Sequence, residues 1–283
     1  MDPLSRKALV SLIHAALRED GAGRDLTSRA VIPAHTRIRA RIVAKAPGVL
    51  AGAKLAALVF TTVDRSLRCR LHRHSGAALT RGQSILTVEG RARSIFSAER
   101  VALNILGYLS GVATLTAAYV RQARGTRAKI LDTRKTVPGL RALQKDAVRA
   151  GGGVSHRSSL SQSILIKTNH LKAVRGKLTI RQAIERAKRA RPKRFVEVEV
   201  ANLTQYKAAL AAKPDAILLD NWSPAQIRKV VRMRRGSRPL LEACGGVTLD
   251  NVRTIVRTGV DRISIGRLTH SAPSLDISLK VIS

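Results

Sequence analysis

The sequence predicts an α/β protein in two parts, an N-terminal α/β region followed by a parallel α/β barrel with fewer than eight strands. A length of 283 residues suits one large or two ordinary domains, and a hydrophobic content of 45% is enough for a packed core. Helical and strand-like patterns follow one another irregularly in the first third, whereas short apolar runs alternate regularly with helical patterns after it. Strand and helix in regular alternation form a parallel sheet with right-handed crossovers.

The first part begins with a predicted amphipathic helix from Leu4 to Arg18, because Leu9, Ile13 and Leu17 recur at helical spacing. Alternation of apolar and polar side chains then predicts strands. The other elements predicted here are strands at 37–44, 67–72 and 84–89 and a helix at 53–63.

A long helical pattern from Ser97 to Arg124 follows. Gly107 and Gly111 within it predict either a break in the helix or a point of close packing. Because no low-complexity linker separates the two parts, we place the boundary near residue 110, which gives domains 1–110 and 111–270.

Six short apolar runs in the second part predict its strands. Six strand–helix units favour a closed barrel over an open sheet, although the count falls short of the eight units of a complete barrel. The predicted strands lie at 128–131, 163–166, 195–200, 216–219, 240–243 and 262–265, and the predicted helices at 140–150, 180–189, 203–212, 224–233 and 249–258.

The charge of the chain is extreme, since 52 Lys and Arg face 18 Asp and Glu and give a net charge of +34. Such an excess is typical of proteins that bind nucleic acid or another polyanion. Here the basic residues are spread over the whole length, and Arg37, Arg39 and Arg41 alternate with apolar residues as on the wet face of a strand. We therefore expect most of the excess to be solvated surface, with nonspecific nucleic-acid contact as the alternative.

The sequence favours a cytoplasmic protein without a membrane segment. No stretch approaches the ~20 consecutive apolar residues that cross a bilayer, and the first residues do not form a signal-peptide pattern. Two cysteines are too few for a disulfide framework or a structural zinc site, which suits a reducing compartment.

In a parallel barrel the functional groups sit where strands end and loops begin. Arg134 and Lys135 follow the first predicted strand, and a guanidinium beside an ammonium suits an anion such as a carboxylate. Gly151 to Gly153 precede His156 and Arg157, which adds backbone freedom and two further donors. The alternative for both segments is a surface loop whose charges are incidental.

Lys167 follows the second strand directly, and we expect it in a partly desolvated mouth of the barrel. Glu199 and Asp220 end the third and fourth strands, where a carboxylate is costly unless it is paired or bound to a metal. These two acids suit ribose hydroxyls, a Mg²⁺ ion, or both, and a buried ion-pair network is the alternative.

Glycines follow the last two predicted strands, at Gly245, Gly246 and Gly266. They expose backbone N–H groups ahead of helices, which is how barrels commonly hold a phosphate. Cations for carboxylates, acids for ribose or metal, and glycines for phosphate together suit a sugar-phosphate donor and a polycarboxylate acceptor.

The chain resembles a known family, the quinolinate phosphoribosyltransferases (carboxylating nicotinate-nucleotide pyrophosphorylases), over nearly its whole length. The resemblance is carried by many motifs in family order. They are DLTS at Asp25, GVLAG at Gly48, ERVALNILGYLSGVAT at Glu99, DTRKTVPGLRALQKDAV at Asp132, GGGVSHR, LIKTNH, VEVEV, LLDN, EACGGVTLDNV and ISIGRLTHSAPSLDISL.

The resemblance implies an N-terminal α/β sandwich and an incomplete barrel, with the tail at about 271–283 returning to the first domain. It implies transfer of phosphoribosyl from phosphoribosyl pyrophosphate to quinolinate with decarboxylation, giving nicotinate mononucleotide, pyrophosphate and CO₂ for NAD synthesis, with Mg²⁺ as cofactor. It also implies a homodimer with shared active sites, or a hexamer built on it.

The resemblance further implies roles for individual residues. Lys167, Glu199 and Asp220 match the catalytic positions, and the two acids match those that hold the ribose hydroxyls and, directly or indirectly, Mg²⁺. Arg100 matches the arginine that enters the partner's site. The remaining substrate-binding matches are Thr133, Arg134, Lys135, His156 and Arg157 at the carboxylates and Cys244, Gly245, Gly246, Ser264, Ile265 and Gly266 at the 5′-phosphate.

The chain departs from the family pattern at a few positions. Thr168 stands where the family typically has Asp, Cys244 where it commonly has Ser, and Gln162 where it commonly has Asp. Two other functions stay open from the sequence. One is a molybdenum-transport-associated paralogue with another substrate, against which the intact segment around Lys167 argues. The other is a basic polyanion-binding protein on this scaffold, against which the scarcity of aromatic residues argues (2% of the chain).

Overall fold

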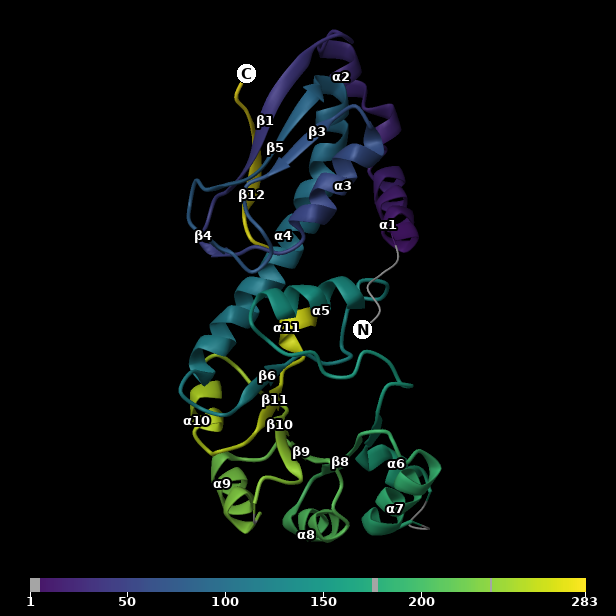
Figure 1. The fold of residues 1–283 in the computed structure, drawn as a ribbon, viewed down its shortest axis with the longest axis vertical. Helices are drawn as coiled ribbons and strands as arrows, with labels where there is room; N and C mark the ends of the chain where they lie inside the picture. Colours follow the sequence, from purple (N-terminus) through teal and green to yellow (C-terminus); the bar gives the residue numbers. More distant parts are fainter. Residues whose placement is uncertain (1–5, 175–177, 235) are drawn as a thin grey trace. The chain divides into compact units, whose positions relative to one another are not determined.

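The computed structural model describes residues 6–174, 178–234 and 236–283 (Figure 1). Leu4 and Ser5, at the start of the first predicted helix, lie outside the described residues. The chain divides into two compact units, which are described separately below. The first contains residues up to 117 together with 137–152 and 271–283, and the second contains 118–136 and 153–270.

The first unit is built on an antiparallel sheet with strand order β12-β1-β5-β3. β1 alternates between exposed arginines and buried Ala40 and Ile42, so one face of the sheet forms the core and the other is wet. Arg39 forms an ion pair with Glu89 on the neighbouring strand (2.7 Å). Its strands are β1 (Arg37–Ala44), β2 (Gly48–Val49), β3 (Arg68–Leu71), β4 (Ala78–Leu79), β5 (Ser84–Arg91) and β12 (Ile277–Val281).

Helices complete the first unit, and α3 packs against β3 and β5 through buried side chains such as Val59 and Phe60 (Figure 1). α2 is capped by Asp25, whose carboxylate accepts a hydrogen bond from the Ser28 amide (3.0 Å). The helices are α1 (Arg6–Glu19), α2 (Leu26–Val31), α3 (Ala53–Val63), α5 (Arg141–Ala150) and the first part of α4 (Ala92–Ala123), with a short 3₁₀ turn at Ala22–Arg24.

The two glycines of α4 mark close packing and not a break, because the helix runs without interruption from Ala92 to Ala123. A Cβ atom at Gly111 would lie 1.9 Å from the carbonyl oxygen of Pro273, and one at Gly107 would lie 2.9 Å from that of Leu275. These glycines therefore let the segment before β12 lie directly on the helix.

α4 is also the one described helix that is long and apolar enough to cross a membrane. However, 61% of its most apolar stretch is buried inside the protein, as in the core helix of a soluble protein.

The second unit is a six-stranded parallel sheet with the order β6-β11-β10-β9-β8-β7. This confirms the predicted fold class. The barrel is incomplete, as the strand count predicted, but the expectation that it closes is wrong: among the described residues β6 and β7 are the edges of the sheet, and one bridge between Leu131 and Val154 extends the β6 edge. The strands are β6 (Lys129–Leu131), β7 (Ile164–Ile166), β8 (Val196–Val200), β9 (Ala216–Asp220), β10 (Leu240–Cys244) and β11 (Arg262–Ser264).

The central strands are buried on both faces, as Val198, Ile217 and Leu241 show (0% exposed). Helices cover the outside of the sheet. Several begin with capping side chains, such as Ser223, whose hydroxyl oxygen accepts a hydrogen bond from the Gln226 amide. These helices are α6 (Thr168–Ala173), α7 (Ile180–Ala190), α8 (Leu203–Ala211), α9 (Pro224–Met233), α10 (Val252–Val256) and α11 (Arg267–His270).

Candidate active site

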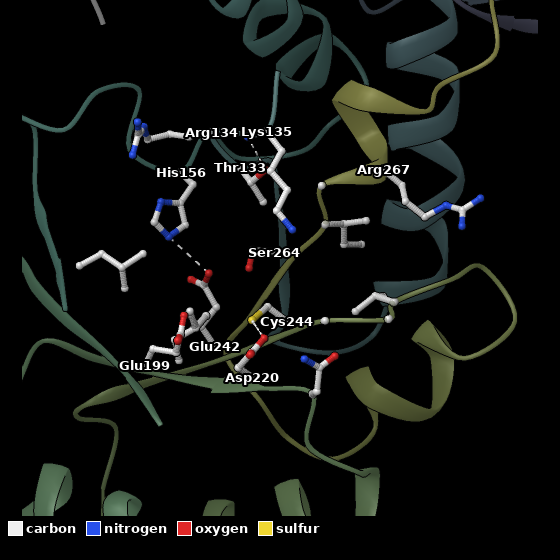
Figure 2. A pocket seen from close by; sticks show the side chains of 18 of the residues that line it. Thr133, Arg134, Lys135, His156, Glu199, Asp220, Glu242, Cys244, Ser264 and Arg267 are labelled. Carbon is white, nitrogen blue, oxygen red and sulfur yellow. Dashed lines mark hydrogen bonds and ion pairs between the residues drawn. The ribbon is translucent and has the colours of Figure 1, made fainter. Parts of the chain in front are cut away.

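A cavity of about 800 Å³ lies at the carboxyl ends of the six parallel strands, within the second unit (Figure 2). Every parallel strand contributes to it, because parallel strands bring their carboxyl ends to one edge. In Figure 2, Arg134 and Lys135 lie on one side of the cavity and Glu199 and Asp220 on the other.

The cationic side is formed by two loops, one with Arg134 and Lys135 and one with His156 and Arg157. The buried Asp132 links them by a hydrogen bond. Asp132 directly follows β6 and has no exposed surface, and its carboxylate accepts a hydrogen bond from the His156 amide (2.8 Å). The Arg157 guanidinium donates to the Ser163 carbonyl (3.0 Å). Burial, and then the neighbouring Arg134, lower the pKa of Arg157. The positive charges of the two guanidinium groups repel each other in this half-buried site. A bound carboxylate would relieve the repulsion, so the pair suits carboxylate binding.

The acidic side consists of Glu199 and Asp220, which are both half-buried. Glu199 Oε1 accepts hydrogen bonds from the amide and the hydroxyl of Thr168 (3.1 and 2.8 Å). The residue that stands where the family has Asp therefore orients this glutamate. Asp220 Oδ1 lies 3.2 Å from Cys244 Sγ, which β-sheet register places opposite it. Burial and Asp220 raise the pKa of the Cys244 thiol, so the thiol stays protonated and donates to the carboxylate.

The glycine side follows β10 and β11. Gly245 has φ +87°, and a Cβ there would lie 2.1 Å from Asn221 Oδ1, so only glycine fits this turn. Gly246 also has positive φ (+57°) and no atom within 4 Å of a Cβ position, which leaves its backbone open to the cavity. Ser264 and Gly266 border the same space. Backbone groups in such turns suit an anionic oxygen.

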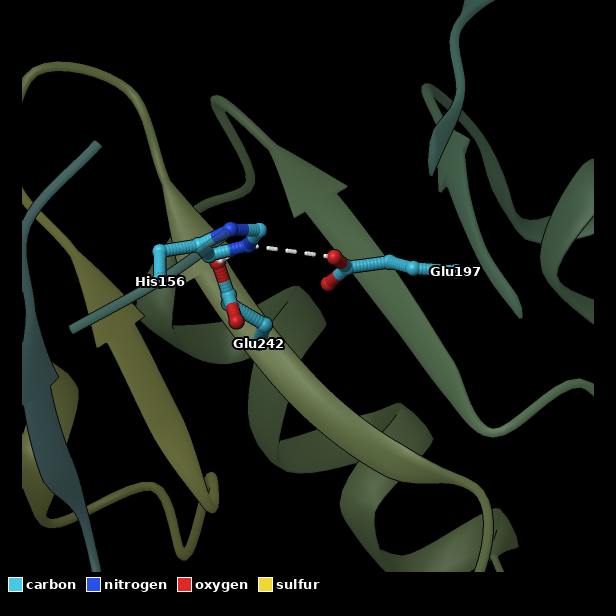
Figure 3. Close-up of side chains that lie close together, drawn as sticks. All are labelled: His156, Glu197 and Glu242. Carbon is cyan, nitrogen blue, oxygen red and sulfur yellow. Dashed lines mark hydrogen bonds and ion pairs between the residues drawn. The ribbon is translucent and has the colours of Figure 1, made fainter. Parts of the chain in front are cut away.

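Three side chains meet at the cavity wall, and two of them, His156 and Glu242, line the cavity (Figure 3). His156 Nε2 lies 3.1 Å from Glu197 Oε2 and 3.3 Å from Glu242 Oε1. Burial by itself would lower the pKa of His156, but the hydrogen bond to Glu197 and the close Glu242 carboxylate outweigh it and raise the pKa. Burial, and then Glu242, raise the pKa of Glu197. The His156, Glu197 and Glu242 side chains, called here the interior cluster, therefore share a proton as a group.

The cavity brings together all but one of the residues that the sequence predicted for the site. Lys167 is among them. It is exposed at the start of α6, so the expectation that this lysine is partly desolvated is wrong for the single subunit. The predicted residues that line the cavity are Thr133, Arg134, Lys135, His156, Arg157, Lys167, Glu199, Asp220, Cys244, Gly245, Gly246, Ser264, Ile265 and Gly266.

Arg100 does not line this cavity. It is an exposed residue of α4 in the first unit. Its role in a partner's site stays a prediction.

Sequence reasoning missed several lining residues. Glu242 had a detectable signal, because it stands inside a hydrophobic strand where an acid is costly. Arg267 and His270 belong to the short helix α11, which the sequence did not reveal. The missed residues are Leu165, Leu218, Asn221, Glu242, Val247, Thr248, Arg267 and His270.

The donor set on the acidic side fits a hard divalent cation. Glu199 and Asp220 offer carboxylate oxygens, and in the described part of the chain hydrogen bonds engage only one oxygen of each. The other oxygens are left for hydroxyl groups, water or Mg²⁺.

The fold and the cavity together define a site whose cationic, acidic and glycine-lined sides suit carboxylate and phosphate groups. Comparison with known proteins gives the family. The model of the quinolinate phosphoribosyl transferase C-terminal domain matches residues 112–280, and that of the N-terminal domain matches residues 25–110. The chain therefore belongs to the quinolinate phosphoribosyl transferase family, which confirms the resemblance seen in its motifs.

Individual relatives are similar over their full length. The nicotinate-nucleotide pyrophosphorylase [carboxylating] of Mycobacterium leprae is 45% identical over 94% of this chain and 95% of its own. The probable enzyme of that name from Bacillus subtilis is 40% identical, over 99% and 95%. The solved structure of the Francisella tularensis nicotinate-nucleotide pyrophosphorylase superposes with a TM-score of 0.91 at 34% identity, over 98% of this chain and 96% of the other.

Proposed function

We propose that this protein transfers the phosphoribosyl group of phosphoribosyl pyrophosphate to quinolinate and removes one carboxylate, giving nicotinate mononucleotide, pyrophosphate and CO₂. One observation carries the proposal: a single cavity combines paired guanidinium groups, two oriented carboxylates and an open glycine turn. Membership in the family and the names of the Mycobacterium leprae and Bacillus subtilis relatives, both nicotinate-nucleotide pyrophosphorylases [carboxylating], favour this reaction over that of the molybdenum-transport-associated paralogue.

In the proposed reaction Arg134, Lys135 and Arg157 hold the two carboxylates of quinolinate and so orient its ring nitrogen. Glu199 and Asp220 hold the ribose hydroxyls, and the turn at Gly245 and Gly246 receives the 5′-phosphate. The nitrogen attacks C1 of the ribose as the bond to pyrophosphate breaks. Because the ribose carries positive charge at that moment, the preorganised carboxylates stabilise it more than a strong base would.

Decarboxylation follows from the new charge on the ring. N-ribosylation makes the pyridine cationic, so the electron pair left at C2 when CO₂ departs is stabilised by the adjacent nitrogen, and a proton then replaces the carboxylate. Too tight a grip by the cations on the departing carboxylate would oppose its loss. Exposed Lys167 at the rim suits a role in orienting both substrates.

We include Mg²⁺ in the proposal, held by Glu199 and Asp220 directly or through water. Bound there, it would neutralise charge on the leaving pyrophosphate. We also propose a cytoplasmic location, in keeping with the two free cysteines. Nonspecific contact with nucleic acid stays a prediction from the net charge of +34.

The purified protein is expected to release pyrophosphate and CO₂ in equal amounts only when quinolinate, phosphoribosyl pyrophosphate and Mg²⁺ are all present. A coupled pyrophosphate assay and capture of CO₂ from carboxyl-labelled quinolinate measure this, and chelation with EDTA is expected to stop the reaction until Mg²⁺ is restored. Omitting one substrate at a time is the control. Absence of product with all components at saturating concentration would overturn the proposed function.

We further propose a homodimer, or a hexamer built from such dimers, in which Arg100 of one subunit serves the site of the other. Arg100→Ala and Arg134→Ala are each expected to inactivate the homo-oligomer. A heterodimer of the two variants contains one intact site and is expected to recover a fraction of wild-type activity. Mixing differently tagged variants and assaying the doubly purified species tests this. No recovery in a confirmed heterodimer contradicts the shared site.

A further inference from the structure

The interior cluster separates two cavities of the barrel unit. His156 lines both of them, whereas Glu242 lines the active-site cavity and Glu197 the other. The second cavity, of about 330 Å³, lies among the amino ends of the strands, next to Lys129, Phe195 and Arg262. The cluster is therefore the floor of the active site and not part of a distant core.

The two carboxylates of the cluster are expensive to bury. Glu197 is 1% and Glu242 0% exposed. Among the described residues, Glu197 Oε1 and both Glu242 oxygens accept no hydrogen bond of good geometry. Arg262 offers partial compensation, 4.0 Å from Glu242 and stacked 5.2 Å over the ring of Phe195. Apolar side chains of the same size would stabilise the fold better, so stability alone does not account for two acids here.

The hydrogen bonds of His156 have a definite direction. Its Nδ1 accepts the backbone N–H of Arg157 at 2.7 Å, which ties the ring to that amide. Its Nε2 faces both carboxylates (Figure 3). A continuous path thus runs from the buried acids through the imidazole to the backbone of Arg157, a residue that lines the active-site cavity.

We propose that Glu197 and Glu242 are positioning residues for the dicarboxylate substrate, which act through His156 on the placement of Arg157. The acids fix the orientation of the ring, the ring fixes the Arg157 amide, and the guanidinium then stands beside Arg134 where two carboxylates can be bound. This inference rests on the proposed function for the identity of the substrate. Neither acid needs to touch the substrate.

A bound metal ion is the competing explanation, since the three ligand atoms lie within 4.8 Å of one another. Metal-ligating histidines donate their second ring N–H to an acceptor. His156 does the opposite, because its second nitrogen accepts a hydrogen bond. The direction of that bond therefore favours the positioning role over a metal site.

The test compares Glu197→Leu and Glu242→Leu with Glu197→Gln and Glu242→Gln in the full-length protein. The Leu variants are expected to raise the KM for quinolinate at least tenfold and to change the KM for phosphoribosyl pyrophosphate less than twofold. The Gln variants keep a carbonyl acceptor for Nε2–H and are expected to lie closer to wild type. Titration calorimetry with quinolinate alone gives the same comparison without turnover. Glu185→Gln, at a half-buried position on α7 whose carboxylate pairs with Arg181 and lines neither cavity, is the matched control.

Each outcome decides the inference. The inference is overturned if folded Leu variants show an equal rise in KM for both substrates, or no rise in KM for either. If the Leu variants do not fold, His156→Asn and the Gln variants decide, and His156→Asn is expected to show the same selective loss. Stoichiometric metal in the purified wild type, lost in the Gln variants, establishes the metal site instead. A wild type that forms no product refutes the proposed function, whereas an active wild type with unaffected variants refutes only the positioning role.

Discussion

Replacing Asp220 by alanine is expected to lower kcat/KM for phosphoribosyl pyrophosphate by roughly 10²–10³-fold, the range seen when a preorganised electrostatic group is removed from an active site. Asp220 ends β9 inside the cavity, and its orientation is set by the Cys244 thiol on the adjacent strand (3.2 Å). The substitution removes a group that binds the ribose hydroxyls. It also removes a negative charge that stabilises the positive charge forming at C1. Steady-state kinetics with each substrate varied in turn measures the effect.

The control for this prediction is Asp250→Ala, an exposed acid of the same unit that does not line the cavity. It removes the same charge from the protein and is expected to leave kcat/KM within twofold of wild type. If both alanine variants reduce activity alike, the effect is one of overall charge and the assignment of Asp220 is wrong. Cys244→Ser keeps a donor to Asp220 and is expected to stay active.

The second large effect concerns stability. Gly111→Ala is expected to lower the free energy of unfolding by about 3 kcal/mol, because the new Cβ would stand 1.9 Å from the Pro273 carbonyl oxygen and must push α4 and the segment before β12 apart. Urea titration followed by circular dichroism measures the change. Since both contacting segments belong to the first unit, the substitution is expected to loosen that unit.

Gly23→Ala is the matched control, since no atom lies within 4 Å of its Cβ position and its φ is not positive. It is expected to leave the unfolding midpoint unchanged or slightly higher, because alanine restricts the unfolded chain more than glycine does. A Gly111→Ala protein as stable as Gly23→Ala would show that the packing at Pro273 relaxes without cost.

The strands of the second unit could be predicted from the sequence because their signal is local. The run at 216–219, for example, became β9 at Ala216–Asp220, and its terminal acid lines the site as expected. Short elements escaped, since α6 and α11 have 6 and 4 residues, too few for a helical period to show. The ambiguity at Gly107 and Gly111 could not be settled locally, because the atoms that require glycine come from residues more than 150 positions away.

The interior cluster could not be predicted from the sequence. Glu197 and Glu199 are two residues apart on β8, so they share a face of the strand, yet only Glu199 was assigned to the site. The partner of Glu197 is His156 from a loop, and no spacing relates the two. Similarly, the thiol–carboxylate contact of Cys244 depends on the register of β9 against β10, which appears only in the folded sheet.

The burial of acids in the barrel unit has a kinetic consequence. Of the 18 acidic residues, Asp132, Glu197 and Glu242 are withdrawn from solvent, while most of the 52 basic residues face it. The groups in contact with the surrounding water are therefore mostly positive, in keeping with the net charge of +34. Anions diffusing nearby are drawn toward such a surface, so their capture quickens in dilute buffer and slows as dissolved ions shorten the reach of the attraction to about 8 Å at physiological ionic strength.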